Sequence, residues 1–147
     1  MSLLLYLDNS VLNRPFDDQR QPRIWLETLA LSIILQMAEA GEVELVKSPI
    51  HLLENDRSPL AVRRQWVARC LALAATELTL SESIRARARA LAGSGLKPLD
   101  ALHAACAEAA AASHFLTCDD RLMKRYAGKI AALNPLDFVL SLSQKSL

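Results

Sequence analysis

The sequence is poor in the features that build zinc sites, disulfide frameworks and membrane spans. Its three cysteines, Cys70, Cys106 and Cys118, are an odd number without a CxxC pair, so neither a structural zinc site nor a disulfide framework is indicated. The three histidines have no HExxH or HxH spacing, which favours packed or hydrogen-bonded side chains over metal ligands. No apolar run is long enough for a signal peptide or a membrane span. We therefore expect a cytoplasmic protein with reduced thiols that does not enter the membrane.

The sequence also lacks an excess of either charge. Its 17 basic and 16 acidic side chains give a net charge of +1, so no overall field draws the chain to nucleic acid or to a membrane. Any contact with nucleic acid must be local. Aromatic residues make up only 5% of the chain, so sequence reading by base stacking is not indicated. The length of 147 residues and the apolar content of 52% fit one globular domain over residues 1–147.

Short apolar runs alternate with longer helical stretches along the whole chain. We expect strands at 3–7, 43–48, 76–80 and 114–118, with a last strand and a terminal helix within 130–143. Helices are expected over 23–42, from Ser48, over 58–74, over 81–93, over 99–113 and within 119–129, with a polar loop after Asp8. Two of them have a serine–proline start, in which Ser48 or Ser58 caps the helix and Pro49 or Pro59 takes its first position. This alternation predicts an α/β fold with a mostly parallel sheet covered on both faces.

Four acidic residues are expected at one edge of that sheet. Asp8 ends the first strand, and Asp119 ends the fourth. Glu54 lies in the short helix after the second strand, and Asp100 opens the alanine-rich helix that leads into the fourth. Crossover helices run antiparallel to the strands, so their N-termini lie at the carboxyl ends of the strands, where such folds bind ligands. Four carboxylates from distant segments can therefore gather there.

Gathered carboxylates repel one another and need a cation or a proton. At an effective dielectric near 20, a pair at 4 Å costs roughly 4 kcal/mol. Hard oxygen ligands without a cysteine or histidine pattern favour Mg²⁺ or Mn²⁺ over zinc. Each acid also has a structural interpretation, as a turn residue, a helix cap, a first-turn charge or a solvated side chain. The coincidence of four acids at one edge is harder to explain structurally.

Several motifs extend over nearly the whole chain: YLDNSVL from Tyr6, LLEND around Glu54, LKPLDALHAACA from Leu96, FLTCDDRLMK from Phe115 and the tail LNPLDFV. The most specific are LDALHAACA and LTCDD in that order. Together they resemble the PIN-domain family, and especially the VapC-type toxins of bacterial toxin–antitoxin pairs. The resemblance implies a PIN-like three-layer α/β/α fold with a central sheet of four to five strands. It also implies a magnesium-dependent endoribonuclease in which water attacks the phosphodiester without a covalent intermediate.

The resemblance assigns roles to particular residues. Asp8, Asp100 and Asp119 fall on the positions of the metal ligands, and Glu54 on that of a fourth catalytic acid. Ser10 and Thr117 fall on small hydroxyl positions that orient the carboxylates. At two points the chain departs from the pattern of the family or leaves an assignment open. Asn9 occupies a position where threonine is more usual, and Glu42 and Glu44 lie near enough to compete with Glu54. Glu54 is preferred because it follows the second strand.

Phosphate contacts and partners are implied as well. Arg14, Lys97 and Arg121 lie near the predicted edge in sequence and are candidates for RNA phosphate contacts, with a solvated basic surface as the alternative for each. The target class is single-stranded or looped RNA. The resemblance also implies a homodimer and a cognate antitoxin. Trp25 and Trp66 lie on amphipathic helices and belong either to the core or to such an interface.

Three other functions remain open at this stage. The first is a catalytically inactive PIN-like module that binds RNA or protein, which Asn9 and the near-neutral charge allow. The second is a metal-dependent phosphatase, which would place an aspartate two residues after the nucleophilic Asp8, where this chain has Ser10. The third is a purely structural α/β domain.

Overall fold

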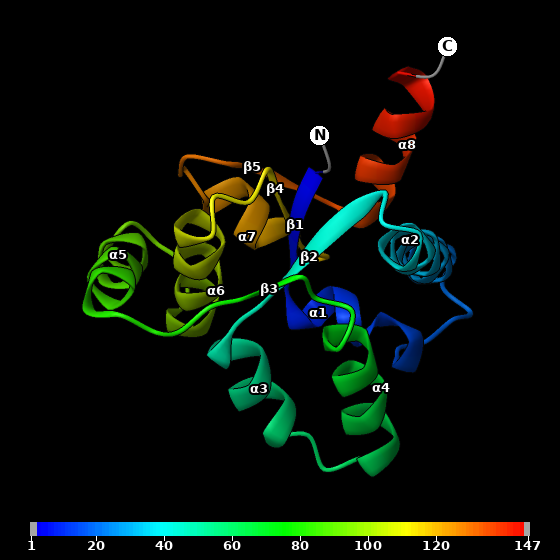
Figure 1. Ribbon diagram of the computed structural model, residues 1–147, viewed down its shortest axis with the longest axis horizontal. Helices are drawn as coiled ribbons and strands as arrows, with labels where there is room; N and C mark the ends of the chain where they lie inside the picture. The colour runs from blue at the N-terminus through cyan, green and yellow to red at the C-terminus, as the bar shows by residue number, and fades with distance from the viewer. Residues whose placement is uncertain (1–2, 146–147) are drawn as a thin grey trace.

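The structure, a computed structural model, describes residues 3–145, and a five-stranded sheet lies at its centre (Figure 1). All neighbouring strands are parallel, in the order β3-β2-β1-β4-β5. The strands are β1 (Leu3–Leu7), β2 (Val43–Lys47), β3 (Thr76–Glu77), β4 (His114–Leu116) and β5 (Ala131–Leu133). This confirms the predicted α/β fold with a parallel sheet.

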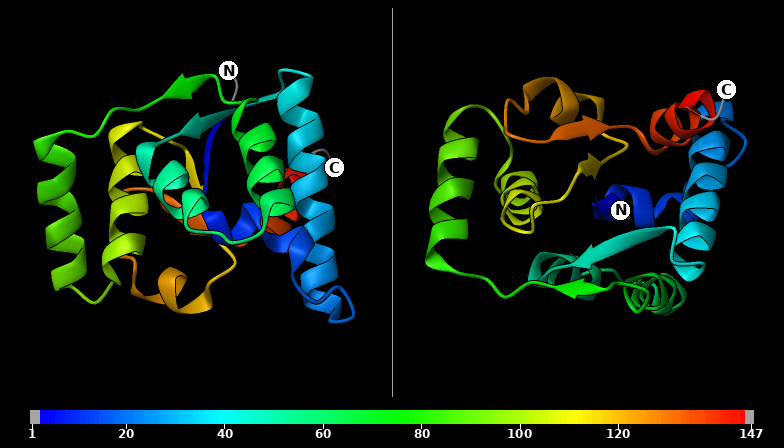
Figure 2. Two further views of the ribbon diagram at one scale, coloured as in Figure 1. Left: turned by 90° about the horizontal axis from the view of Figure 1, so that it is seen from below. Right: turned by 45° about the horizontal axis from the view of Figure 1, so that its top comes forward.

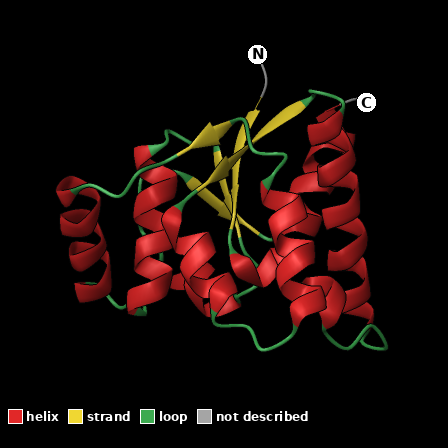
Figure 3. Ribbon diagram, turned by 60° about the horizontal axis from the view of Figure 1, so that its bottom comes forward, coloured by secondary structure: helices red, strands yellow, loops and turns green. Residues whose placement is uncertain are grey.

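Helices cover both faces of the sheet, as Figures 2 and 3 show. They are α1 (Asn9–Leu12), α2 (Pro22–Glu39), α3 (Pro49–Asp56), α4 (Ala61–Leu71), α5 (Glu82–Gly93), α6 (Pro98–Ala109), α7 (Asp120–Arg125) and α8 (Pro135–Lys145), with a 3₁₀ turn η1 (Arg14–Phe16). Within residues 3–145, no helix combines the length and apolarity that crossing a bilayer requires.

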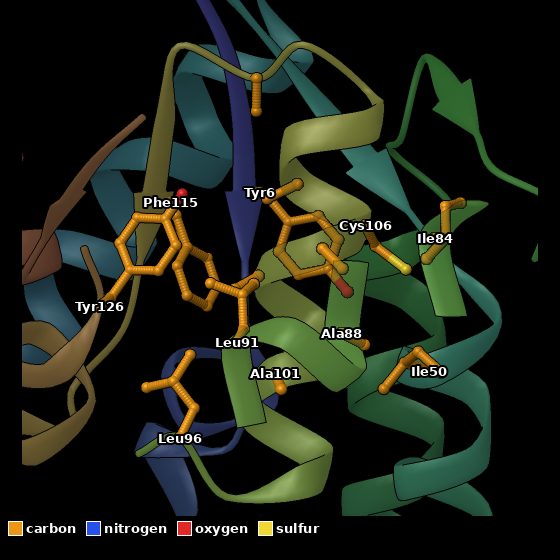
Figure 4. Packing of buried hydrophobic residues seen from close by; sticks show 14 of the residues in the cluster. Tyr6, Ile50, Ile84, Ala88, Leu91, Leu96, Ala101, Cys106, Phe115 and Tyr126 are labelled. Carbon is orange, nitrogen blue, oxygen red and sulfur yellow. The ribbon is translucent and has the colours of Figure 1, made fainter. Parts of the chain in front are cut away.

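Two apolar cores lie on opposite faces of the sheet because side chains alternate along each strand. Tyr6 and Phe115 point to the first core, which α3, α5, α6 and the region of α7 complete (Figure 4). Leu5, Leu7 and Leu116 point to the second, which α1, α2, α4 and α8 complete. The consecutive apolar residues of β1 are therefore explained by burial on both faces.

Several element boundaries follow local signals. Ser48 caps α3 with Pro49 at its first position, Ser81 caps α5, and Asp119 caps α7. Gly41, with a φ of 76°, follows the end of α2 in the left-handed conformation that glycine adopts without strain. These boundaries lie close to the expected ones.

Three local expectations are wrong. The predicted polar loop after Asp8 is instead the short helix α1, followed by η1, and Asp8 is the N-cap. The helix expected from Ser58 begins later, at Ala61, with Leu60 at the N-cap and no side-chain cap. Ser58 instead belongs to the turn that ends α3, where its N–H donates to Asn55 O. β3 is limited to two residues, since only Thr76 and Glu77 pair with β2.

Helix α2 has two apolar faces. Ile24, Leu31 and Ile34 are buried. The other face exposes Trp25, Leu29 and Ile33, which are spaced four residues apart and are 51%, 41% and 42% exposed. We call these three residues the outer face of α2. Trp66, in contrast, packs against the second core, and its indole N–H donates to Leu12 O at 2.9 Å.

Candidate active site

The carboxyl ends of β1 and β4 are adjacent because these strands pair in the middle of the sheet. Leu7 is opposite Leu116, and the Asp8 N–H donates to Leu116 O at 3.1 Å. Each strand is followed at once by polar residues: Asp8 after β1, and Thr117 to Asp119 after β4. Pairing of the two strands therefore brings residues from opposite ends of the sequence to one point on the sheet edge.

Asp8 is buried, with 4% exposure, at the start of α1. Its carboxylate accepts hydrogen bonds from the Ser10 hydroxyl and from the Val11 N–H. Burial raises the pKa of Asp8, and the opposing effects of His103, the Ser10 and Thr117 hydroxyls and the Val11 N–H do not cancel it. A carboxylate in this position gains from any cation that reaches it.

Asp119 caps α7, where its carboxylate accepts from the N–H groups of Arg121 and Leu122 at 2.9 and 3.2 Å. Its own N–H donates to the Thr117 hydroxyl at 3.1 Å. The Thr117 and Ser10 hydroxyl oxygens are 3.4 Å apart. The hydroxyls of Ser10 and Thr117 thus connect the segment of Asp8 to that of Asp119.

Asp100 occupies the first turn of α6 and is half-buried. Burial raises its pKa, and the charges of Asp8 and Asp119 raise it further, against smaller opposing effects of His103 and Lys97. The charge of Asp100 is therefore opposed by that of Asp8, which follows β1, and by that of Asp119, which follows β4. That all three acids bind one ion stays a prediction.

Glu54 lies on α3 with its side chain 30% exposed. Its Oε1 is 2.9 Å from Nε2 of His103. His103 is one turn along α6 from Asp100, so α6 presents both residues on neighbouring positions of one face. Glu54 is thus connected to the acidic edge through α6.

The predicted basic residues differ in their surroundings. Lys97 and Arg121 line a small surface hollow together with Asp100, Asp119 and Arg125. Both are exposed. The guanidinium of Arg14, in contrast, forms ion pairs with Asp17 at 3.1 Å and with Glu27 at 2.8 Å. Its role as a phosphate contact stays a prediction.

The chemistry of the acidic edge fits a hydrated divalent cation. All candidate ligands are carboxylate oxygens, the donors that Mg²⁺ and Mn²⁺ prefer. Among residues 3–145, no three histidine, cysteine, aspartate or glutamate side chains are arranged to ligate one ion together. Because Mg²⁺ keeps several waters and takes one or two carboxylates, Asp8, Asp100 and Asp119 fit such an ion held largely through water.

Sequence reasoning missed the polar groups beneath this edge. Tyr6, Ser48, His51 and His103 are all buried and joined by hydrogen bonds. His103 follows Asp100 by three residues and Ser48 caps α3, but neither spacing identifies a partner on another element. The expectation that these histidines are packed and hydrogen-bonded is confirmed for His51 and His103.

Comparison with known proteins gives a family and a fold. The family model of the PIN domain matches residues 5–129. The crystal structure of PAE2754 from Pyrobaculum aerophilum is similar with a TM-score of 0.61, over 97% of this chain and 90% of that chain, at 17% sequence identity. A likeness at this level of identity concerns the fold alone. The search of curated proteins gives no match.

Proposed function

This chain belongs to the PIN domain family, whose members are typically metal-dependent nucleases, and we propose that it is a Mg²⁺-dependent endoribonuclease. Asp8, Asp100, Asp119 and Glu54 are the proposed catalytic residues. The observation that carries the proposal is the placement of the three aspartates: Asp8 and Asp119 follow the paired strands β1 and β4, and Asp100 lines one surface hollow with Asp119. The raised pKa of Asp100, caused by burial and by the charges of Asp8 and Asp119, agrees with this placement. Perturbed carboxylates that share one edge are typical of a site that binds a cation.

Asp8, Asp100 and Asp119 would hold the ion, and Mn²⁺ is an alternative to Mg²⁺. When bound, the divalent ion supplies positive charge that activates water and stabilises the charge on the scissile phosphate. The Ser10 hydroxyl donates to Asp8 and so fixes the direction of that carboxylate. The N–H groups of Arg121 and Leu122 do the same for Asp119. Glu54 positions the attacking water, and the products carry a 5′-phosphate and a 3′-hydroxyl.

The proposed substrate is single-stranded or looped RNA. Lys97 and Arg121 are exposed beside Asp100 and Asp119, where they can neutralise phosphates on either side of the scissile bond. With a net charge of +1, the chain has no overall field that attracts RNA, so we expect these contacts to be local. Weak, strongly salt-dependent RNA binding is expected.

A finer proposal is that the chain is the VapC-like toxin of a type II toxin–antitoxin pair, acting in the cytoplasm as a homodimer. The outer face of α2, with Trp25, Leu29 and Ile33 exposed, supports an interaction with a second protein surface. The motifs that resemble VapC-type toxins support the assignment to this subfamily. Co-purification with the product of a small adjacent reading frame would test it.

The alternative is an inactive PIN-like module that binds RNA or protein. Two observations favour it: Asn9 follows Asp8 where threonine is more usual, and the described side chains form no three-ligand cluster. Such a module would bind RNA without cutting it under any metal condition.

Cleavage of RNA by the purified protein distinguishes the two. End-labelled RNA is incubated with Mg²⁺, Mn²⁺ or EDTA, and the ends of the products are identified. We expect cleavage with either metal and none with EDTA, and a loss of about 100-fold or more in Asp100→Asn. Asp137→Asn, an exposed aspartate on α8, is the matched control and should cleave normally. Cleavage that survives in Asp100→Asn would refute the proposed site.

A further inference from the structure

A buried chain of hydrogen bonds runs from Glu54 into the first core. His103 Nε2 is 2.9 Å from Glu54 Oε1, and its Nδ1 is 2.6 Å from the Tyr6 hydroxyl. That hydroxyl is 2.7 Å from the Ser48 hydroxyl. Tyr6, Ser48 and His103 are no more than 1% exposed. The chain joins α3 to α6 and to β1, and Figure 4 shows the Tyr6 ring within the apolar cluster.

The other end of this chain reaches the backbone beside Asp8. The Ser48 N–H donates to Nδ1 of His51 at 3.0 Å, so that nitrogen carries no hydrogen. The hydrogen of His51 is therefore on Nε2, which donates to Leu7 O at 2.6 Å. Burial lowers the pKa of His51 to about 3, which keeps the ring neutral. One network thus supports Glu54 and the residue that precedes Asp8.

With His103 in its neutral form, the donors and acceptors of the network fix the direction of each hydrogen bond. A Glu54 carboxylate can only accept, so His103 Nε2 must donate to it. A neutral His103 then has a bare Nδ1, which accepts from the Tyr6 hydroxyl, and Tyr6 in turn accepts from the Ser48 hydroxyl. A phenol is protonated at neutral pH, so Tyr6 supplies the hydrogen that this requires. Every donor is used once.

Ring packing limits the orientation of the two imidazoles. The Tyr6 ring stacks on His51 with centroids 4.6 Å apart and an angle of 22°. It meets the His103 ring edge to face at 5.6 Å and 68°. His103 therefore cannot rotate freely without losing both its Tyr6 hydrogen bond and this contact.

We propose that His103 is a positioning residue for Glu54, with Tyr6 and Ser48 selecting the imidazole tautomer that donates to the carboxylate. This inference rests on the proposed ribonuclease function. With Oε1 occupied by His103, Glu54 keeps Oε2 to orient the attacking water. A buried polar network without such a role is rarely more stabilising than apolar side chains of the same shape, which favours a functional reason for it.

The tautomer is measured directly by long-range ¹H–¹⁵N NMR of the histidine rings in the metal-free protein. We expect the His103 hydrogen on Nε2 in the wild type. In Tyr6→Phe, Nδ1 loses its donor, and the signals should shift toward the other tautomer or an exchanging mixture. A hydrogen on Nδ1 of His103 in the wild type would overturn the proposal whether or not the protein cuts RNA.

Kinetics test the role with a pair of amide variants. His103→Gln puts an amide N–H near the place of Nε2 and keeps a donor for Glu54, whereas His103→Asn puts its amide near Nδ1 and does not. We expect His103→Asn to lower kcat by about 10–100-fold with little change in KM, as is typical when the partner of a site residue is removed. His103→Gln should recover most of that loss.

Tyr126→Phe is the control for Tyr6→Phe, because the Tyr126 hydroxyl is also a buried donor. It donates to the Glu108 carboxylate at 2.6 Å, whereas Tyr6 donates to His103. It should leave kcat unchanged while Tyr6→Phe lowers it. Equal kcat in wild type, His103→Asn and His103→Gln would overturn the positioning role alone. A wild type that does not cut RNA with Mg²⁺ or Mn²⁺ would instead refute the proposed function, and with it the catalytic part of this inference.

Discussion

Glu27 and Asp8 are both buried carboxylates, but their surroundings shift the two pKa values in opposite directions. Glu27, on α2, is fully buried and is contacted by Arg14 at 2.8 Å, Arg23 at 3.2 Å and the amide of Asn134. Burial alone would raise its pKa, but the hydrogen bonds from Asn134 and Arg14 and the charges nearby lower it. The negative charge of Glu27 is thus compensated within the fold by the positive charges of Arg14 and Arg23.

Among residues 3–145, Asp8 has hydrogen-bond donors but no arginine or lysine contact like those of Glu27. The Ser10 hydroxyl and the Val11 N–H donate to it, and its pKa is raised by burial. The difference teaches that burial alone does not distinguish a structural carboxylate from a functional one. The compensation of its charge does, since an uncompensated group gains most from an added cation.

The largest change in the free energy of unfolding is expected at Glu27, the carboxylate whose charge is compensated. Glu27→Ala leaves Arg14, Arg23 and Asn134 without their shared partner, and breaking such a buried pair costs about 3–5 kcal/mol of unfolding free energy. Chemical denaturation measures the change. Glu39→Ala, at an exposed position on the same helix, should have little effect. A loss below about 1 kcal/mol for Glu27→Ala would mean that the cluster is not structural.

Acid should remove the same stabilisation without a mutation. The pKa of Glu27 is lowered from 4.5 in the folded state, so its contribution is present above that value and is lost as pH falls through the lowered pKa. The free energy of unfolding should fall there with a slope of up to about 1.4 kcal/mol per pH unit from this group. Asp8 has the opposite sign, because the charged form of a group with a raised pKa costs stability. If Glu27→Gln shows the wild-type slope below pH 4.5, another group is responsible.

Replacing Asp8, the carboxylate whose charge is not compensated, should stabilise the protein, and by less than the loss of Glu27 destabilises it. Without metal, Asp8→Asn should melt about 2–4 °C higher than the wild type, the shift that about 1 kcal/mol produces at this chain length. Mn²⁺ at about ten times its dissociation constant should add about 1.4 kcal/mol to the wild type, and less to the variant. Differential scanning calorimetry with EDTA and with Mn²⁺ measures both. An equal rise with Mn²⁺ in both proteins would place the ion elsewhere.

The smallest change in stability is expected at the exposed ion pair between Arg23 and Asp120. Arg23 contacts both oxygens of Asp120 at 2.7 Å, but the two side chains are 51% and 57% exposed. Arg23→Ala should lower the melting temperature by less than about 3 °C, since exposed ion pairs contribute little and Glu27 keeps Arg14 and Asn134. A loss as large as that of Glu27→Ala would mean that Arg23 is the main partner of Glu27.

The sequence predicts the fold and the positions of the acids well because these depend on local patterns. Consecutive apolar residues identify β1, and the serine–proline start identifies α3. The place of Asp8 after β1 and of Asp100 at the start of α6 then follows from how parallel strands and crossover helices are arranged.

The contacts of those acids are not predictable in the same way. The pairing of Glu54 with His103 joins residues 49 positions apart, and that of Tyr6 with His103 joins residues 97 apart. No local spacing encodes such partners. The later start of α4 has a local cause instead, because Ser58 belongs to the turn that follows α3, where its N–H donates to Asn55 O.

The central position of β1 also constrains the order of events during synthesis. β1 is made before its neighbour β4, which begins at residue 114, and Asp119 follows still later. At about 5–20 residues per second, a ribosome needs several seconds between them. A nascent chain, or one truncated before residue 119, therefore carries Asp8 without Asp119 beside it. Translation past residue 119 is therefore a condition for assembling the acidic edge, and we expect products that end before it not to cut RNA.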